Sequence, residues 1–434
     1  MGLKTVLIVT PYFPPSSLAG VHRARHLAKH LPAAGWHPVV LCVDEAFHEE
    51  RLDAGLAQLV PATTEVIKVG AISPRYTRPL GLGDLSLRAF GALKRAVIKE
   101  ITSRTVDMVL ITGSPYYPML LAPMVSTKFG VPVVLDFQDP WVSAWGSRQP
   151  TLTKAGMTFQ LAGTLEPKAL RGAAFVTSVS DIQNAEMVAR YAWLDRSRMA
   201  AIPIGCDSDD FRALREMPAM PGAALIAKGC INLSFVGTFM PRSEPLVKVV
   251  LAAFARARAA YPAAMAPVRL NFIGTSNQPN ATDHYRVRPL AQAAGVGDAV
   301  NEVPQRVPYL DALGVLARSD GLLLIGSDEP HYTASKIYPA LMSGRPYVSL
   351  FHADSSAHSI LSKAGGSLAL SFSDSRELEA CEAAISAALL TLATEADTIQ
   401  SADPAAYARF EARAIAGRFA YLFDAVRSEW TKAA

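Results

Sequence analysis

The sequence predicts an α/β protein built from two doubly wound domains, each a parallel sheet with helices on both faces. Short runs rich in Val, Ile and Leu alternate with stretches of helix length, as in consecutive βαβ units. The 434 residues exceed a typical single domain, and because half of them are hydrophobic the chain can bury substantial cores. The same rhythm starts again after a segment rich in proline and small residues at 217–228.

In the first half, short apolar runs predict strands, and the longer stretches between them predict helices. The runs are too short for helices and carry the branched residues that favour an extended backbone. We predict strands at 5–10, 38–43, 64–69, 108–112, 131–136, 175–178 and 199–203. We predict helices at 22–30, 85–103, 118–128, 153–170 and 180–191.

The second half repeats this pattern, which sets the predicted domains at 1–217 and 228–403. A last helical stretch, 404–434, is predicted to pack back on the first domain. Two such domains facing one another would form a cleft at the carboxyl ends of both sheets, where doubly wound folds bind ligands. The strands are predicted at 232–236, 269–273, 300–303, 321–325, 346–350 and 367–370, and the helices at 246–261, 285–294, 309–318, 335–343 and 357–364.

Composition excludes several classes of protein. Lys and Arg number 42 against 38 Asp and Glu, and a formal charge of +4 is too balanced for a nucleic-acid partner. The four cysteines lack CxxC spacing and histidine partners, which predicts reduced thiols and no metal centre. The chain begins with a strand-like segment instead of a secretory signal, and its apolar runs are too short to span a membrane. We therefore expect a cytoplasmic protein, which would meet a membrane only at the inner face.

The most specific chemical signal follows the strand predicted at 321–325. A polar loop leads from it to Ser335 and Lys336, which open the next helix. Free backbone N–H groups and the helix dipole favour an anion at such a terminus, and Lys336 adds a full positive charge. This pattern predicts a diphosphate site. The alternative is an exposed lysine in the first turn of a helix.

Two other loops are predicted to contribute to anion binding. Gly237 and Thr238 end the first strand of the second domain, and Arg242 follows where it could hold the same phosphates bidentately. In the first domain, Gly20 closes a flexible loop ahead of a helix. A solvated arginine and an ordinary strand-to-helix loop are the alternatives.

The order and spacing of several motifs resemble a retaining glycosyltransferase of family 4, which has the GT-B fold of two Rossmann-like domains. The resemblance spans nearly the whole chain, and no single motif decides it. In the first domain the motifs are VTPYFPP at 9–15 with Gly20, VLDFQDPW at 134–141, VTSVS at 176–180, and IPIGCD at 202–207 with Phe211. In the second domain they are FVGT at 235–238, VPQRVP at 303–308, SKIY at 335–338 and GRP at 344–346.

The resemblance implies a nucleotide-sugar donor held mainly by the second domain. Arg242 and Lys336 would neutralise the diphosphate as it departs, and Gly20 would approach the donor sugar or phosphate. The departing diphosphate would itself take the acceptor proton, so neither a protein nucleophile nor a cofactor is implied. The other donor-binding positions implied are Gly237, Thr238, Arg306, Val307, Ser335, Ile337 and Tyr338.

The chain departs from the family pattern at two positions. The family carries two glutamates spaced E-x7-E, and His331 and Pro339 occupy these positions here. Asp328 or Glu329 is a candidate replacement for the first glutamate, and nothing replaces the second. A proline at position 339 also removes a backbone donor early in a helix. These departures bear on donor affinity, donor identity and activity.

The first domain carries groups suited to an acceptor sugar. Asp136 and Asp139 lie at a strand end beside Trp141, so carboxylates could hydrogen-bond to hydroxyl groups while the indole stacks on a ring. Ser114 and Tyr116 follow the neighbouring strand. The alternative is that the aspartates only stabilise loops, as aspartates at strand ends often do.

The segment 75–104 is basic and has apolar residues at roughly helical spacing. Such a helix could touch anionic lipid or a lipid-linked acceptor at the membrane surface. A helix that packs on the sheet and exposes a solvated basic face is the alternative.

The leading prediction is transfer of a sugar from a UDP- or GDP-linked donor to a glycan, glycolipid or small acceptor, as in cell-surface polysaccharide biosynthesis. The missing glutamates motivate a second hypothesis, a degenerate GT-B protein that binds nucleotide or glycan without catalysis. A nucleotide-sugar epimerase on the same fold is a third.

Overall fold

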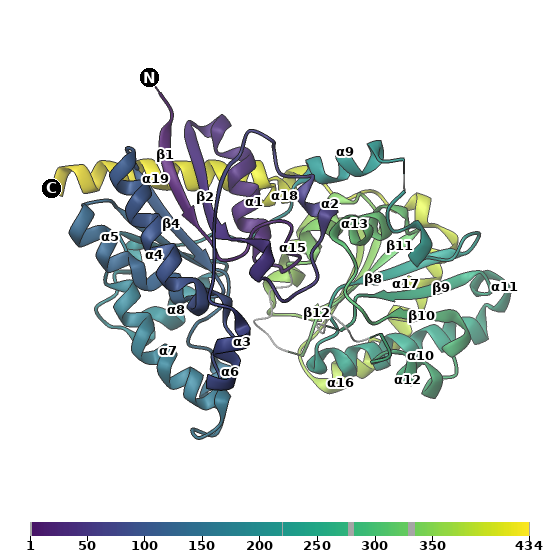
Figure 1. The fold of residues 1–434 in the computed structure, drawn as a ribbon. Coiled ribbons are helices and arrows are strands. Elements are labelled where there is room, and N and C mark those ends of the chain that lie inside the picture. Colours follow the sequence, from purple (N-terminus) through teal and green to yellow (C-terminus); the bar gives the residue numbers. More distant parts are fainter. Residues whose placement is uncertain (1, 219, 277–281, 329–334, 434) are drawn as a thin grey trace. The chain divides into compact units, whose positions relative to one another are not determined.

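The computed structural model describes residues 2–218, 220–276, 282–328 and 335–433, and it contains two compact units (Figure 1). The first unit comprises Met1–Ile204 and Ala412–Ala434, and the second comprises Gly205–Glu411. Each has a parallel sheet with helices on both faces, as predicted, and the predicted strands are all present with small shifts at their ends.

The first unit is a seven-stranded parallel sheet in the order β3-β2-β1-β4-β5-β6-β7. Helices α1 and α19 cover one face of the sheet, and α4, α5, α7 and α8 cover the other. Alternate residues of each strand point to opposite faces, so the same strands contribute to both cores. The strands are β1 (Lys4–Val9), β2 (Trp36–Val43), β3 (Glu65–Val69), β4 (Met108–Gly113), β5 (Val133–Phe137), β6 (Phe175–Ser178) and β7 (Met199–Ala201). The helices of four or more residues are α1 (Val21–His30), α2 (Ala54–Ala57), α3 (Pro74–Thr77), α4 (Leu85–Ser103), α5 (Ala122–Phe129), α6 (Ala144–Ser147), α7 (Lys154–Leu170), α8 (Asp181–Arg190) and α19 (Ala412–Ala433).

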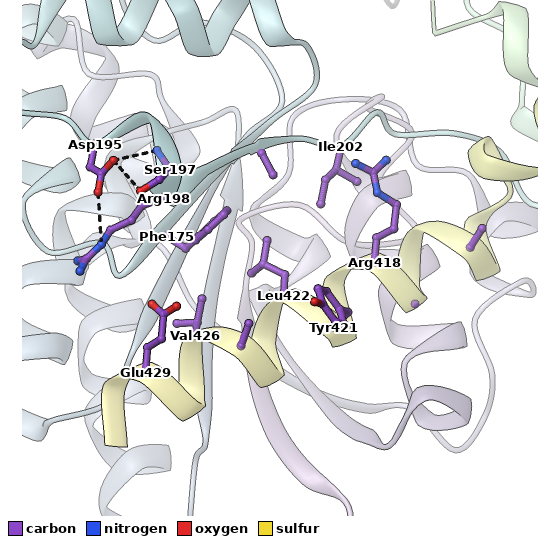
Figure 2. A pocket seen from close by; sticks show the side chains of 14 residues that line it. Phe175, Asp195, Ser197, Arg198, Ile202, Arg418, Tyr421, Leu422, Val426 and Glu429 are labelled. Atoms are coloured by element: carbon purple, nitrogen blue, oxygen red, sulfur yellow. Dashed lines mark hydrogen bonds and ion pairs between the residues drawn. The ribbon is translucent and has the colours of Figure 1, made fainter. Parts of the chain in front are cut away.

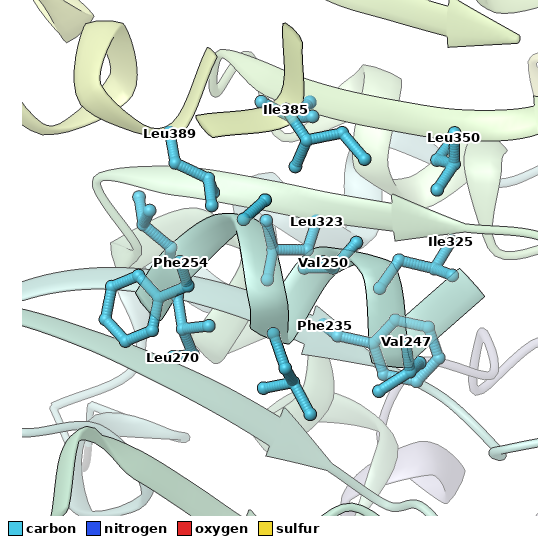
Figure 3. Packing of buried hydrophobic residues seen from close by; sticks show 14 of the residues in the cluster. Phe235, Val247, Val250, Phe254, Leu270, Leu323, Ile325, Leu350, Ile385 and Leu389 are labelled. Atoms are coloured by element: carbon cyan, nitrogen blue, oxygen red, sulfur yellow. The ribbon is translucent and has the colours of Figure 1, made fainter. Parts of the chain in front are cut away.

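The second unit is a six-stranded parallel sheet in the order β10-β9-β8-β11-β12-β13. Its main core lies between the sheet and α10, α12, α16 and α17, where Phe235, Phe254 and Leu270 are buried (Figure 3). The strands are β8 (Ile231–Val236), β9 (Val268–Ile273), β10 (Val300–Val303), β11 (Gly321–Ile325), β12 (Tyr347–His352) and β13 (Ser367–Phe372). The helices are α9 (Ser208–Glu216), α10 (Glu244–Ala260), α11 (Pro262–Met265), α12 (Arg288–Ala293), α13 (Tyr309–Arg318), α14 (Ile337–Met342), α15 (Ser356–Ala364), α16 (Ser375–Ala380), α17 (Glu382–Thr394) and α18 (Pro404–Tyr407).

The chain divides after Ile204, earlier than the 217–228 segment where composition placed the boundary. Helix α9 belongs to the second unit, because its apolar residues Phe211 and Leu214 are buried beside α13. Gly222 lies in a turn, and its backbone N–H donates to Asp311 Oδ1 at 2.7 Å. The proline and glycine signal near residue 220 therefore marks a turn within the second unit.

The stretch predicted as one helix at 404–434 is divided in two. The backbone becomes extended at Glu411, which separates α18 and a short 3-10 turn from α19. Helix α19 belongs to the first unit, where Ile415, Phe419 and Phe423 are buried against β1 and β2. The aromatic residues at helical spacing in the sequence are the residues that face this sheet.

Candidate functional site

The carboxyl ends of β8 and β11 bring two predicted loops together in the second unit. The loop after β8 contains Gly237, Thr238 and Arg242, and the loop after β11 leads toward Lys336. Because β8 and β11 are paired neighbours, their ends are adjacent. The buried Ser243 hydroxyl donates to the carbonyl of Gly326 at 2.7 Å, which fastens one loop to the other.

Lys336 is the central feature of this edge. Its side chain is half-buried, and its Nζ lies 4.1 Å from the centre of the Phe235 ring. Burial lowers the pKa of the Lys336 ammonium to about 7. Among the residues that the structure describes, none forms an ion pair or hydrogen bond with this amine. The aromatic face offers only part of the stabilisation that water would give, so an anion would gain from binding here.

Gly237 makes room for this lysine. Its φ of 141° lies in a region that other residues rarely adopt. A β-carbon built at position 237 would lie 3.3 Å from Lys336 Cδ and 3.8 Å from Nζ. A glycine at the end of β8 is therefore needed for both the backbone turn and the close approach of the lysine.

Arg242 lies in the short turn η7 (Pro241–Ser243) at the same edge. Its Nε donates to Asp328 Oδ1 at 2.6 Å, and both side chains are about half exposed. Asp328 therefore orients the guanidinium without shielding it from solvent. The guanidinium is a planar group that can bind phosphate oxygens bidentately, and its exposure at this edge places it within reach of a ligand.

The remaining donor-binding candidates divide between the surface and the core. Ser335 is exposed just before α14, but Ile337 and Tyr338 are buried, and the Tyr338 ring packs 4.8 Å from that of Phe410. The side chains of Ile337 and Tyr338 thus hold α14 in place. Thr238 is half-buried near Gly237, and Arg306 and Val307 are half-buried in the loop after β10.

The two positions that depart from the E-x7-E pattern differ in what the structure describes. Pro339 is the third residue of α14, where a helix leaves the backbone N–H without an intrahelical partner, so proline is tolerated there. Glu329 and His331 lie outside the described residues.

The sequence analysis missed Glu302, which organises the loop after β9. This buried carboxylate accepts hydrogen bonds from the backbone N–H groups of Val287 and Arg288, at 3.0 and 2.7 Å, and from Arg286. Arg286 in turn donates to the carbonyl of Phe239 at 2.8 Å. Glu302 therefore connects the start of α12 to the loop that contains Gly237. A glutamate within the short strand Val300–Val303 was the signal available in the sequence.

At the carboxyl edge of the first sheet, Asp136 is fully buried and its carboxylate is engaged internally. Its Oδ2 accepts from Arg23 Nε at 3.1 Å and from Thr112 at 2.7 Å, and its Oδ1 accepts from Thr177 at 2.7 Å. Arg23 is buried as well and donates to the carbonyls of Ile202 and Pro203. These contacts favour the structural alternative for Asp136 over contact with an acceptor.

The other acceptor candidates lie around an aromatic pair. Tyr116 stacks on Trp141 with ring centres 5.3 Å apart and planes inclined by 16°, and its hydroxyl donates to the carbonyl of Asp139 at 2.9 Å. Burial raises the pKa of the Tyr116 phenol well above its usual value, so it stays neutral. Ser114 and Asp139 are exposed beside this pair, where a polar ligand can reach them.

Gly20 lies beside the same edge. Gln138 donates to the carbonyl of Gly20 at 3.1 Å and to Thr112 Oγ1 at 2.9 Å, which joins this loop to the Asp136 network. A β-carbon at position 20 would lie 3.4 Å from the carbonyl oxygen of Ser114. The loop after β1 is thus closely packed against the loop after β4.

A pocket of about 830 Å³ lies at the lateral edge of this sheet, between β7 and α19 (Figure 2). Leu422 and Val426 contribute its apolar wall, and the exposed Tyr421 stands at the helix surface. Arg418 donates to the carbonyl of Ala201, and Arg196 donates to that of Met199. These two carbonyls lie on the side of the edge strand β7 that faces away from β6. None of the residues predicted from the sequence to bind donor or acceptor lines this pocket.

The basic segment 75–104 forms α4 and the turns before it. One face of α4 is buried through residues such as Leu85, Leu93 and Val97, while Lys94, Arg95 and Lys99 are exposed. This is the arrangement of a helix packed on a sheet with a solvated basic face. Among the described residues, no helix has both the length and the hydropathy that crossing a membrane requires.

Known proteins account for this architecture. Residues 19–205 match the glycosyl transferase 4-like domain. Solved structures that match nearly the whole chain include Anabaena HepE in complex with UDP and glucose, with 16% identity, a TM-score of 0.58, and coverage of 97% of this chain and 100% of HepE. The chain has the GT-B fold. No protein among the curated sequences matched it.

Two other structures support the GT-B fold of this chain. A glycosyltransferase from Rickettsia africae is 13% identical with a TM-score of 0.62, and the alignment covers 98% of this chain and 99% of the other. The trehalose-6-phosphate synthase OtsA is 12% identical with the same TM-score, and 99% of each chain is covered. The fold predicted from the sequence is thereby confirmed.

Proposed function

We propose that this protein is a glycosyltransferase that transfers a sugar from a nucleotide-linked donor, with the diphosphate of the donor held by Lys336 and Arg242. The observation that carries the proposal is the Lys336 ammonium, which lies over Phe235 at the carboxyl edge of the second sheet. A diphosphate would supply the negative charge that this amine lacks among its described neighbours. HepE was crystallised with UDP-glucose, which supports a UDP-linked donor as the first to test.

In the proposed reaction, the bond between the anomeric carbon and the diphosphate breaks while the acceptor oxygen bonds to that carbon. The leaving diphosphate accumulates negative charge, and Lys336 and Arg242 stabilise it more strongly in the transition state than in the ground state. The acceptor proton passes to the departing phosphate oxygen. Attack on the same face, with retention, follows from the family resemblance, and neither a metal ion nor a protein nucleophile takes part.

The donor site is tested by calorimetry with UDP-glucose, GDP-mannose and other nucleotide sugars. We expect one of them to bind, and K336M to weaken that binding by about a hundredfold. The matched control is K248M, since Lys248 is an exposed lysine on α10 that pairs with Glu244 at 2.7 Å. Equal binding by wild type and K336M would refute the proposed site.

A non-catalytic GT-B protein is the second candidate, and the proline at position 339 is the observation that favours it. Incubation of the wild type with the donor that binds, a panel of alcohol and sugar acceptors, and water distinguishes the two. Glycosylated acceptor or free sugar would eliminate the non-catalytic reading. A donor that binds tightly and is never consumed would support it.

The third candidate, an epimerase, needs groups that move protons at the sugar. At the second sheet, Asp328 already pairs with Arg242, and Glu302 is buried in backbone hydrogen bonds. Interconversion of nucleotide sugars without acceptor would support this candidate over sugar transfer.

We propose further that the acceptor carries a lipid and is presented at the inner membrane surface, as in cell-surface polysaccharide biosynthesis. The exposed apolar side chains of the first unit support a membrane contact around α6 and α7. Trp145 and Leu152 are 66% and 91% exposed, and Met157 and Leu161 are exposed one turn apart on α7. The segment 141–165 contains basic residues and no acidic residue, which suits an anionic membrane.

Flotation with anionic phosphatidylglycerol vesicles tests this contact. We expect the W145S/L152S double variant to lose vesicle binding and the I72S/Y76S variant to keep it. Ile72 and Tyr76 are also exposed, but they lie next to or within the basic segment 75–104. The opposite result would move the contact to that basic segment, and no flotation of the wild type would refute the membrane proposal.

A further inference from the structure

A second polar cavity lies in the second unit, at the amino ends of β11 and β12. Its volume is about 560 Å³, within the range of small-molecule sites. The residues around it come from the ends of α9 and α13, from the turn before β12, and from the segment 396–401. Lys336 and Gly237 lie at the opposite, carboxyl edge of the same sheet, so the cavity is separate from the proposed donor site.

Three arginines from three different elements line this cavity. Arg215 is in the last turn of α9, Arg318 ends α13, and Arg345 follows Gly344 in the turn before β12. Arg345 Nε donates to the carbonyl of Ala317 at 2.8 Å, and Arg318 Nε donates to that of Pro221 at 3.4 Å. These bonds use only Nε, so the Nη groups of both arginines remain available.

The three guanidinium groups lack carboxylate partners. In the parts of the chain that the structure describes, Arg215, Arg318 and Arg345 form no ion pair, and Asp397 is the only acidic residue in the cavity lining. Other arginines of the protein are paired, as Arg258 is with Asp298 at 2.7 Å. The carboxyl ends of α9 and α13 explain part of the positive charge, because cations stabilise helix carboxyl termini. Each such terminus carries only about half a charge, so an excess of positive charge remains.

We propose that this cavity binds a small phosphate-bearing anion. Guanidinium groups match the geometry of phosphate oxygens bidentately, and three of them around one cavity provide donors from several directions. The volume also accommodates more than a single phosphate group, which points to a phosphorylated small molecule. The site goes beyond the proposed sugar transfer and does not depend on it, since no residue is shared between the two sites.

Calorimetric titration of the full chain with inorganic pyrophosphate, inorganic phosphate, sulfate and a phosphate monoester such as glycerol 3-phosphate, at constant ionic strength, tests the proposal. The titrations use K336M, in which pyrophosphate cannot occupy the donor site through Lys336. We expect one pyrophosphate site, and a weakening of about tenfold when R215Q is added, as for the loss of one charged hydrogen bond. Arg215 suits the test because the structure gives it no intramolecular bond whose loss would disturb the fold.

R212Q is the matched control. Arg212 lies on the same helix but pairs with Asp209 at 2.9 Å and does not line the cavity. We expect this variant to bind pyrophosphate as K336M alone does. R345Q is a second test from a different element, and its melting temperature separates loss of binding from loss of the bond to Ala317.

Several outcomes would overturn the proposal. Unchanged pyrophosphate binding after R215Q would do so, as would the absence of binding in K336M at any pyrophosphate concentration below the millimolar range. In the latter case the arginines would serve only to neutralise helix ends. If UDP-glucose binding persists in R215Q and is lost in K336M, the donor site does not depend on the cavity. The two proposals then stand or fall separately. A stronger response to phosphate monoesters than to pyrophosphate would identify the phosphorylated small molecule as the ligand class.

Discussion

The carboxyl edges of the two sheets each contain a charged side chain set among buried residues, but the two charges are satisfied in opposite ways. In the first unit, Asp136 accepts three hydrogen bonds, one of them from the buried Arg23. In the second unit, Lys336 has only the face of Phe235 beneath it among the described residues. A buried charge with a full set of partners holds a fold together, whereas one without them is available to a ligand.

The comparison also explains why the two residues could not be distinguished in the sequence. Asp136 lies at the end of an apolar strand and Lys336 lies in the segment that follows one, which are positions where doubly wound folds often place functional residues. Only the distant partners differ: Arg23 is more than a hundred positions from Asp136, and no local spacing connects them.

Breaking the Asp136 network should produce the largest effect on stability. D136N leaves Arg23 charged and buried without its carboxylate, and removing one partner of such a pair typically costs about 3–5 kcal/mol. Urea unfolding should show a loss of this order, while UDP-glucose affinity stays unchanged. E45Q is the control, because Glu45 forms a partly exposed pair with Lys68 and its loss should change stability by at most about 1 kcal/mol. A D136N protein of normal stability would remove the structural role assigned to this residue.

Removing the unpaired cation should have the converse effect. K336M is expected to weaken UDP-glucose binding by about a hundredfold, since it deletes charged contacts to the diphosphate. Its free energy of unfolding should be unchanged or higher, because a desolvated ammonium is replaced by an apolar side chain. Calorimetry and urea unfolding on the same preparation measure both quantities. A large loss of stability in K336M would mean that the lysine has a structural role after all.

The pH dependence of donor binding sharpens the same contrast. Burial lowers the pKa of Lys336 to about 7, so the amine of the free protein is neutral above that pH, and a bound diphosphate would require it to take up a proton. UDP-glucose affinity should therefore fall by about tenfold per pH unit above pH 7, and should be constant below it. The diphosphate diester itself does not titrate in this range. Affinity that is flat from pH 6 to pH 9 would contradict the assignment.

A smaller effect is expected at Gly237. G237A introduces a β-carbon next to Lys336 and forces alanine into an unfavourable backbone region, at about 1–3 kcal/mol. We expect lower thermal stability and donor binding weakened by about tenfold or less. G163A is the control, since Gly163 lies within α7 with open space around it, and alanine there should stabilise by about 0.5–1 kcal/mol. Equal behaviour of the two variants would show that the close approach at Gly237 is unimportant.

The sequence was sufficient for the strands because buried parallel strands are short, apolar and separated by helices. It was insufficient for α9, α16 and α17, which no prediction included. Helix α17 is apolar with little separation into faces, so the helical period that identifies amphipathic helices is weak there. Helix α9 carries a clear pattern, but the proline signal at 218–221 just after it led to a predicted boundary at 217–228, whereas the compact units divide after Ile204.

At the candidate site, the sequence indicated the loops but not the state of the side chains. Lys336 and Arg242 were predicted from their position after strands, yet the pairing of Arg242 with Asp328 depends on two loops that are far apart in sequence. Glu302 was missed because its partners are backbone groups, which leave no trace in residue type. The predicted roles of Ser335, Arg306 and Val307 in donor binding stay predictions.

The first unit is discontinuous in sequence, since α19 completes the face of its sheet that β1 and β2 present. During synthesis, all residues of the second unit emerge from the ribosome before the last helix of the first. The sheet of the first unit therefore stays incompletely covered while the second unit is made. The second unit can finish folding before the first, whereas domains usually fold in order from the amino terminus. Truncation of α19 should accordingly cause the first unit to aggregate.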